Sequence, residues 1–140
     1  MTDVDVPTRL LPKLTDANRA FWTGGANGEL LVQRCEACDR WLLPPVDSCP
    51  VCGGAVALSP VSGHGTVFTY TTNYHQFHPD IPPPNLIAIV TLDEQDDLRL
   101  MTNLVGCTED DIASGSAVRV QFEDHGEIFY PVFELIGQGR

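Results

Sequence analysis

The spacing of hydrophobic side chains changes along this 140-residue chain, from a helical period near its start to a strand-like period over most of its length. Residues 1–14 show no regular period and predict an extended arm. Within residues 17–22 the apolar side chains fall at i, i+3 and i+4, which is one face of a helix. Thr15 or Asp16 can cap its start by accepting backbone N–H bonds. The glycine pair at 24–25 predicts that this helix is short.

The rest of the chain predicts short β-strands separated by turns. Val118, Val120 and Phe122 alternate with polar residues and predict one buried strand face. Pro131 lies inside the last apolar stretch and predicts an edge or a bulge there, because proline cannot donate a ladder hydrogen bond. Residues 108–113 predict a single helical turn. The segments that predict strands are 30–33, 41–43, 66–74, 86–92, 99–105, 117–122 and 129–136.

Four of the five cysteines form two Cys-x2-Cys pairs separated by ten residues. Cys35 with Cys38, and Cys49 with Cys52, can each supply two thiolates to one tetrahedral ion. A closed shell of four thiolates leaves no position for water or substrate, so the spacing predicts one structural zinc. The same ligands also suit the iron of a rubredoxin-type site. Two redox-active dithiols fit less well, because the expected βαβ context is missing.

Cys107, the fifth cysteine, has no second cysteine near it in the sequence. An isolated cysteine of this kind is ordinarily a buried and inert thiol. A catalytic nucleophile would need a base and a group to orient that base, and the sequence assigns neither. We therefore interpret Cys107 as structural.

These patterns together predict a mainly β protein with three parts. An N-terminal arm and short helix occupy residues 1–27, and a rubredoxin-like four-cysteine zinc ribbon occupies residues 28–58. Five short strands within residues 59–140 fit a small Greek-key barrel of the OB type.

Two connections between the barrel strands differ from ordinary turns. The loop from Tyr74 to Asn85 is rich in proline yet keeps one aromatic and two histidine side chains, which is typical of a functional loop. The acidic run at 93–97 lacks the glycine and the spacing of a calcium-binding loop. We interpret this acidic run as a solvated turn.

The net charge of −11 is concentrated in the second part of the chain. Residues 1–60 carry five basic and seven acidic side chains, and residues 61–140 carry three basic and twelve acidic ones. Such an acidic barrel cannot neutralise phosphates, so the charge argues against nucleic-acid binding. The sequence begins without a secretory leader pattern and holds no apolar run of about 20 residues. These features predict a cytoplasmic protein without membrane contact.

Taken together, the motifs resemble the family of zinc-ribbon plus OB-fold proteins long catalogued as a domain of unknown function. The resemblance covers nearly the whole chain, and all four family cysteines are retained. The segments that carry it are Phe21-Trp22, Gly28–Cys38, Pro44-Pro45, Cys49–Gly53, Gly63–Val67, Phe77–Pro79, Met101–Cys107 and Val120–Asp124.

The resemblance implies a non-catalytic subunit that associates with a thiolase-superfamily enzyme and helps to bind or channel acyl-CoA. The lipid-transfer-like aldolases that shorten steroid side chains are such enzymes, and hot-dog-fold enoyl-CoA hydratases are the alternative partner. It further implies a hetero-oligomer in which the ribbon and helix dock on the partner. Likeness at the level of fold does not by itself fix function.

Six residues are expected to contact the partner or the acyl-CoA: Arg19, Phe21, Trp22, Tyr74, Phe77 and His78. Phe77 has a second interpretation, in which it folds back and plugs the end of the barrel. The rival function is that of a single-stranded nucleic-acid module, in which Tyr70, Tyr74 and Phe77 would stack on bases. A self-sufficient enzyme is disfavoured, because no nucleophile–base pair is evident.

Overall fold

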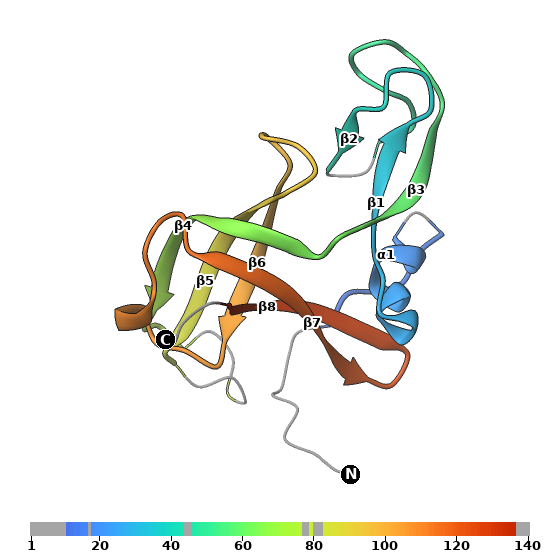
Figure 1. Cartoon of the computed structure of the whole chain (residues 1–140). Coiled ribbons are helices and arrows are strands. Elements are labelled where there is room, and N and C mark those ends of the chain that lie inside the picture. The colour runs from blue at the N-terminus through green and yellow to red at the C-terminus, as the bar shows by residue number, and fades with distance from the viewer. Residues whose placement is uncertain (1–10, 17, 44–45, 77–78, 80–82, 137–140) are drawn as a thin grey trace.

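The computed structural model describes residues 11–16, 18–43, 46–76, 79 and 83–136 (Figure 1). The helical elements are α1 (Arg19–Thr23), η1 (Gly24–Asn27) and η2 (Glu109–Asp111). The strands are β1 (Leu30–Cys35), β2 (Trp41–Leu42), β3 (Val56–Val61), β4 (His64–Asn73), β5 (Asn85–Leu92), β6 (Arg99–Val105), β7 (Ala117–His125) and β8 (Ile128–Leu135).

The N-terminal helix starts later than its sequence pattern predicts, at Arg19. The turn before it is closed by a reciprocal pair of bonds between a threonine and an asparagine. Thr15 N–H donates to Asn18 Oδ1 at 2.7 Å, and Asn18 N–H donates to Thr15 Oγ1 at 3.3 Å. Thr15 therefore accepts a backbone N–H as expected, but in the turn that leads into the helix.

The α-helix ends before the glycine pair, and a 3-10 turn follows it directly. Gly24 and Gly25 continue as the 3-10 turn η1, which ends at Gly28 with a left-handed φ of 73°. A Cβ atom on Gly25 would lie only 2.5 Å from the Cβ of Phe129. These glycines therefore let the helical segment rest directly against the β7–β8 hairpin.

A small antiparallel sheet with the strand order β2-β1-β3 stands beside the barrel (Figure 1), and the four paired cysteines lie at the end of β1 and in the loops that join these strands. The sequence pattern gives no separate prediction of β3, whose residues alternate weakly and include Pro60. Because β3 is the edge strand of this sheet, the missing N–H of Pro60 interrupts no second ladder.

The second sheet closes into a five-stranded barrel with the order β4-β5-β6-β8-β7, which confirms the predicted OB-type fold. Val118 is completely buried, and Val120 and Phe122 pack partly buried against the same core. Pro131 pairs with Phe122 of β7, at a point where β8 has no register partner in β6. The core side chains of the barrel include Val67, Ala88, Val90, Leu92, Leu98, Leu104, Val118 and Phe133.

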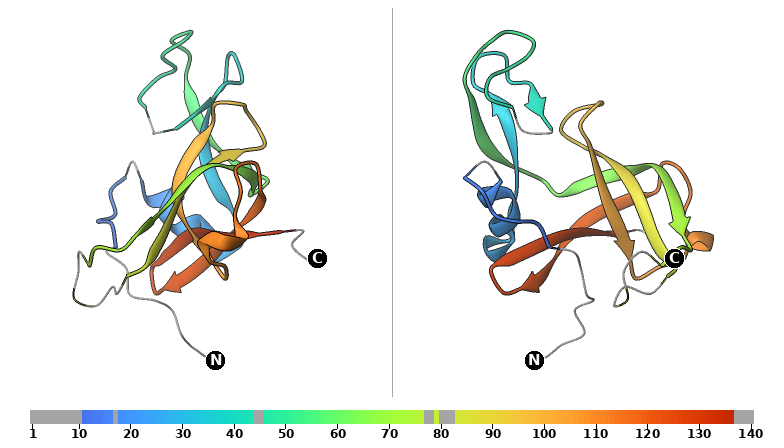
Figure 2. Two further views of the ribbon diagram at one scale, coloured as in Figure 1. Left: turned by 90° about the vertical axis from the view of Figure 1, so that its left-hand side faces the viewer. Right: turned by 180° about the vertical axis from the view of Figure 1, so that it is seen from behind.

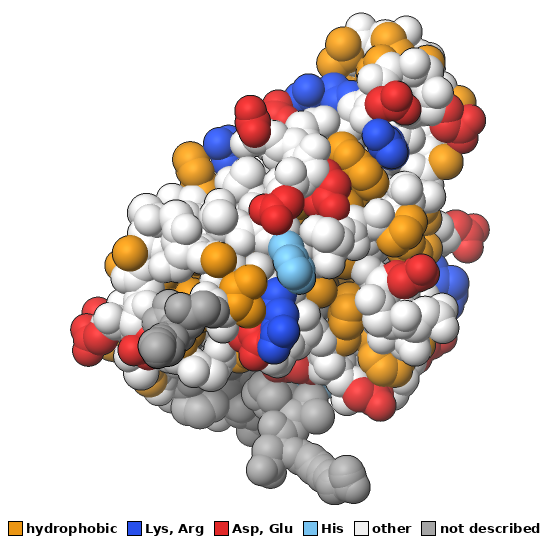
Figure 3. Space-filling model, in the orientation of Figure 1, with side chains coloured by type: hydrophobic (Ala, Val, Ile, Leu, Met, Phe, Trp, Pro, Cys, Tyr) orange, Lys and Arg blue, Asp and Glu red, His pale blue; other side chains and the backbone are white. Residues whose placement is uncertain are grey.

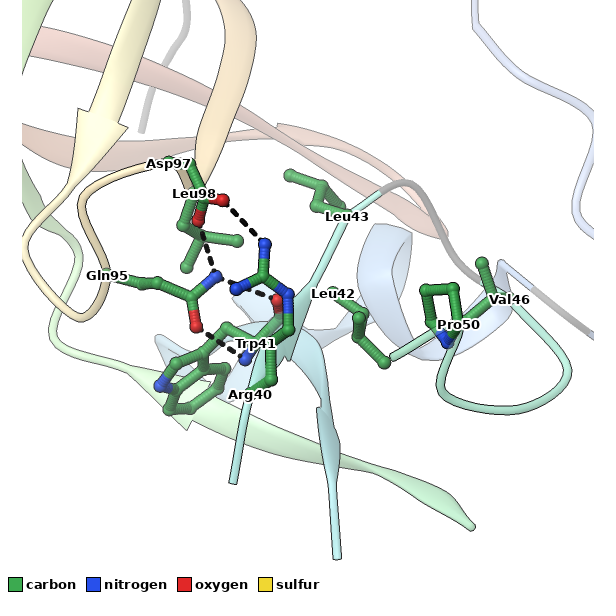
Figure 4. Close-up of a pocket in the computed structure, with 9 residues that line it drawn as sticks. All are labelled: Arg40, Trp41, Leu42, Leu43, Val46, Pro50, Gln95, Asp97 and Leu98. Atoms are coloured by element: carbon green, nitrogen blue, oxygen red, sulfur yellow. Dashed lines mark hydrogen bonds and ion pairs between the residues drawn. The ribbon is translucent and has the colours of Figure 1, made fainter. Parts of the chain in front are cut away.

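The acidic turn between β5 and β6 holds the ribbon against the barrel (Figure 4). Gln95 Oε1 accepts the Trp41 N–H at 2.9 Å, and Gln95 Nε2 donates to the Trp41 carbonyl at 3.0 Å. Arg40 and Asp97 add an ion pair with an N–O distance of 2.5 Å. We call these two contacts the ribbon latch. The interpretation of this turn as merely solvated is therefore wrong.

Among the described residues, no helix combines the length and the apolar character needed to cross a bilayer.

Candidate metal centre and apolar hollow

The two Cys-x2-Cys pairs form two turns of the same local geometry. In each turn the first cysteine donates its N–H to the carbonyl five residues on, at 2.8 Å for Cys35 and 3.0 Å for Cys49. The carbonyl of that cysteine accepts the N–H four residues on, at 3.0 and 2.8 Å respectively. The residue after the second cysteine, Asp39 or Gly53, is left-handed, with φ of 66° and 76°. Equivalent turns of this kind can present their thiols to a common centre.

The four predicted thiols do meet at one point. Their sulfur atoms all lie within 4.8 Å of one another. The Sγ atoms of Cys35 and Cys52 are 3.4 Å apart, and those of Cys38 and Cys49 are 3.8 Å apart. In a tetrahedral site with Zn–S bonds of about 2.3 Å, the sulfur–sulfur edge is about 3.8 Å. The cluster therefore fits a single tetrahedral ion.

The electrostatics of the cluster favour a bound cation. The Cys38 N–H points at the Cys35 sulfur, at 3.4 Å, and lowers the pKa of Cys35 to about 6. The Gly54 N–H lowers the pKa of Cys52, but the neighbouring thiols, Cys35 first, outweigh it and raise that pKa to about 12. Four thiolates this close repel one another, so all four ionise together only around a positive ion.

Gly54 lies against the cluster and leaves no room for a side chain. A Cβ atom there would meet the Ala37 Cβ at 2.9 Å, the Cys35 Sγ at 3.1 Å and the Cys52 Sγ at 3.3 Å. Contacts this short force the thiols or the backbone to move. Steric packing, and not only the cysteine spacing, therefore fixes the geometry of the centre.

An apolar hollow of about 360 Å³ lies between α1, the end of β2 and β6. Phe21 and Trp22 both line it, with their rings perpendicular and 5.0 Å apart. Arg19 does not line the hollow, and instead forms an exposed ion pair with Glu127 at 3.5 Å. The residues that line the hollow are Asn18, Phe21, Trp22, Leu43, Arg99, Leu100 and Met101.

Sequence reasoning did not assign Leu43, Arg99 or Met101 to a site. The sequence feature that could have identified Met101 was the alternation within the predicted strand 99–105, which places Met101 on the strand face opposite Leu100. Met101 is 70% exposed, which is unusual for a methionine in a barrel strand.

Tyr74 lies at a second hollow, of about 390 Å³, away from Phe21 and Trp22. Its hydroxyl donates to Glu109 Oε1 at 2.8 Å, and the Thr72 hydroxyl donates to the same oxygen at 2.6 Å. The hydrogen bond to Glu109 raises the pKa of Tyr74. The remaining candidates, Phe77 and His78, lie outside the described residues.

Cys107 lines this second hollow and is partly buried. Burial raises the pKa of its thiol, and the Asp111 carboxylate adds to the effect. A raised pKa leaves less thiolate at neutral pH, which is the opposite of what an activated nucleophile needs.

The face in Figure 3 shows cationic side chains lying singly among acidic ones, without a basic stripe. A groove that follows a nucleic-acid backbone needs a continuous positive track. This face does not offer one.

Two family models match the ribbon and most of the barrel. The model described as "ChsH2, rubredoxin-like zinc ribbon domain" matches residues 22–58, and the model described as "ChsH2, C-terminal OB-fold domain" matches residues 58–123. The matched ranges meet at residue 58, within β3.

Solved structures and a curated protein resemble the chain over most of its length. A chain of the "Ltp2-ChsH2(DUF35) aldolase" is 36% identical, with a TM-score of 0.77 over 89% of this chain and 98% of that one. A DUF35 protein of unknown function from Sulfolobus solfataricus shares the fold, with a TM-score of 0.61 and 15% identity over 86% of this chain and 85% of that one.

A "Probable enoyl-CoA hydratase alpha subunit" from Thermomonospora curvata is 36% identical over 131 residues. The alignment covers 91% of this chain but only 40% of that relative's length.

Proposed function

The chain belongs to the ChsH2 (DUF35) family, and from this premise we propose that it is a non-catalytic subunit of an acyl-CoA aldolase complex. In this proposal it binds a thiolase-superfamily aldolase and helps to bind or channel the acyl-CoA substrate. One observation carries the proposal: the match covers 98% of a chain of the solved "Ltp2-ChsH2(DUF35) aldolase", at 36% identity. A match that nearly complete includes both the ribbon and the barrel.

We assign zinc to the four-cysteine centre, and a structural role to that zinc. Four sulfur ligands close the tetrahedron, so no coordination position is left for a substrate or a reactive water. The ion would hold the two cysteine turns together. The ribbon latch would then keep the ordered ribbon in a fixed position against the barrel. Four-sulfur coordination therefore supports a zinc ion that takes no part in a reaction.

The side chains of the described residues also support a non-catalytic role. Cys107 has a raised pKa, with the carboxylate of Asp111 as its charged neighbour. His125, which lies beside Glu123 at 3.3 Å, is on the β7–β8 hairpin and lines neither hollow. The Thr72 and Tyr74 hydroxyls do meet a carboxylate in the second hollow, but their hydrogen bonds lower the pKa of Glu109, which makes it a weak base for acyl transfer or aldol chemistry.

A hydratase is the second candidate partner. The Thermomonospora curvata relative motivates it, because that protein is called a probable enoyl-CoA hydratase alpha subunit. The chain spans 40% of that relative, so the hydratase activity of the longer protein need not depend on the matched part. The aldolase match covers 98% of its counterpart chain and is preferred for that reason.

Co-expression tests the choice of partner. The chain would be co-expressed with the thiolase-superfamily aldolases and, separately, with the hot-dog-fold hydratases of its source organism. Size-exclusion chromatography with light scattering should give a stable complex of defined stoichiometry with an aldolase. A complex with a hydratase alone would select the second candidate, and no complex with either would overturn the proposal.

A further inference from the structure

The barrel is closed by a very short seam between β6 and β8. These parallel strands pair only at Leu104 with Phe133 and at Val105 with Glu134. Residues 99–102 of β6 pair with β5 on one side and, among the residues that the structure describes, with no strand on the other. Figures 1 and 2 show β6 and β8 diverging from the end where they meet. The first half of β6 therefore has a free edge toward β8.

The register identifies the backbone groups on that edge. The Leu92 N–H donates to the Leu98 carbonyl at 2.8 Å. Hydrogen-bonding residues alternate along an antiparallel strand, so Leu98, Leu100 and Thr102 face β5. Arg99 and Met101 therefore direct their N–H and C=O groups toward the free edge. In the part of the chain that the structure describes, no backbone hydrogen bond reaches them there.

The apolar hollow lies beside this edge. Leu100 points into it from β6, and Phe21, Trp22 and Leu43 line it from α1 and the ribbon. Side chains alternate along a strand, so every second side chain of an added strand would enter this hollow. Exposed edges of this kind are templates for pairing with another chain.

Charge restricts what can pair there. The guanidinium of Arg99 lies 3.9 Å from the centre of the Phe68 ring, on the outer face of the sheet. Among the described residues no carboxylate forms an ion pair with Arg99. On a chain of net charge −11 this is a local positive site, and it complements an acidic segment.

We propose that the free edge of β6 accepts an extended segment of the aldolase as an added strand. The segment would pair through its main chain with Arg99 and Met101, place apolar side chains in the hollow, and place a carboxylate beside Arg99. Main-chain pairing supplies affinity in this mode, and the alternating side chains supply specificity. This inference rests on the proposed function, because it names where that partner binds.

Amide hydrogen exchange on the unmodified protein tests the proposal directly. The Arg99 and Met101 amides should exchange quickly in the free chain and at least tenfold more slowly in the aldolase complex. The neighbouring Leu100 and Thr102 amides, already bonded to β5, should change much less. A complex that forms without protecting Arg99 and Met101 would overturn this inference and leave the proposed function standing.

Two variants at one position add a second test. Met101→Pro removes an edge N–H but no bond to β5, and Met101→Ala keeps that N–H while shortening the same side chain. We expect Met101→Pro to weaken the complex about tenfold more than Met101→Ala, measured by titration calorimetry. Equal losses in both variants would contradict strand addition.

Other occupants of the edge give different results. If Arg99 and Met101 were already protected in the dilute free chain, residues 1–10 of this chain would be the occupant. If their protection in the free chain rose with protein concentration, a second copy would be the occupant. Either result would contradict the assignment of this edge to the aldolase. If no aldolase complex forms at all, both the proposed function and this inference fail.

Discussion

At the scale of single residues, the candidate metal centre depends on the lack of a side chain at Gly54 as well as on the four thiols. The cysteine spacing predicts the ligands, because two short turns around one ion allow few arrangements. The spacing does not predict that Gly54 must lack a side chain, since that follows from the approach of Ala37 in the folded ribbon. The sequence therefore predicts the four thiols that meet in the structure, but not the packing around them.

Gly54→Ala should loosen the metal centre, because the added methyl group would crowd the sulfur atoms of Cys35 and Cys52. Overpacking of this kind costs about 1–3 kcal/mol. Zinc transfer to a chromogenic chelator should be faster than in the native chain. Adding Ala37→Gly removes the nearest colliding atom and should restore part of the retention. Unchanged zinc transfer in Gly54→Ala would show that the cluster tolerates a side chain there.

Cys107 should react slowly with alkylating agents in the zinc-loaded chain. Burial and Asp111 raise its pKa, so at pH 8 a smaller fraction is thiolate than in a free cysteine, and the thiolate is the reactive form. Iodoacetamide labelling followed by mass spectrometry should give a rate below that of glutathione and still rising above pH 9. The Cys107→Ala variant measures the background labelling of the other cysteines. A rate above that of glutathione at pH 7 would point to an activated thiol.

At the scale of elements, strands with strict alternation were predictable and tertiary contacts were not. In β7, the burial of Val118, Val120 and Phe122 confirms the buried face that their alternation predicts. The strand β3 was missed, since its Pro60 is tolerated only because of its edge position. The acidic turn was misjudged, because Gln95 and Asp97 meet Trp41 and Arg40 more than fifty residues away in sequence.

Gln95→Ala should release the ribbon from the barrel while leaving the metal in place. The variant loses two bonds to the Trp41 main chain, each worth about 1 kcal/mol. Amide exchange in residues 39–43 should rise, and the affinity for the aldolase should fall. Asp96→Ala changes an exposed neighbour in the same turn and should alter neither. Full affinity in Gln95→Ala would mean that the ribbon orientation does not matter for binding.

The ionic half of the ribbon latch should also depend on pH. Arg40 first, and then Gln95, lower the pKa of Asp97. Its contribution is therefore present above the ordinary aspartate pKa and is lost as the pH falls through the lowered value. Amide exchange in residues 39–43, corrected for intrinsic rates, should rise in acid less steeply in Asp97→Asn than in the native chain. Identical profiles would show that the ion pair contributes nothing.

At the scale of the whole molecule, the predicted order of helix, ribbon and barrel is present, but its surfaces were only partly predictable. Phe21 and Trp22 do share one hollow, whereas Tyr74 belongs to another. The free edge of β6 exists because β6 and β8 separate before residue 104. No local sequence pattern predicts where two strands distant in the sequence separate. The roles of Phe77 and His78 stay predictions, with Phe77→Ala expected to weaken assembly while sparing the melting temperature of the free chain.

The charge of the molecule leads to a prediction against the rival function. A barrel this acidic gains little from counterion release, so single-stranded DNA or RNA should bind negligibly at physiological salt. Fluorescence anisotropy with labelled oligonucleotides checks this. Tight binding that weakens steeply with added salt would revive the nucleic-acid interpretation.

The most direct test of the central claim is the turnover of acyl-CoA substrate by the chain alone, by the aldolase alone and by their complex. We predict no turnover by the chain alone, full turnover by the complex, and the same turnover when the complex carries Cys107→Ala. Turnover by the isolated chain, or its loss in a folded Cys107→Ala complex, would contradict the role of a non-catalytic subunit.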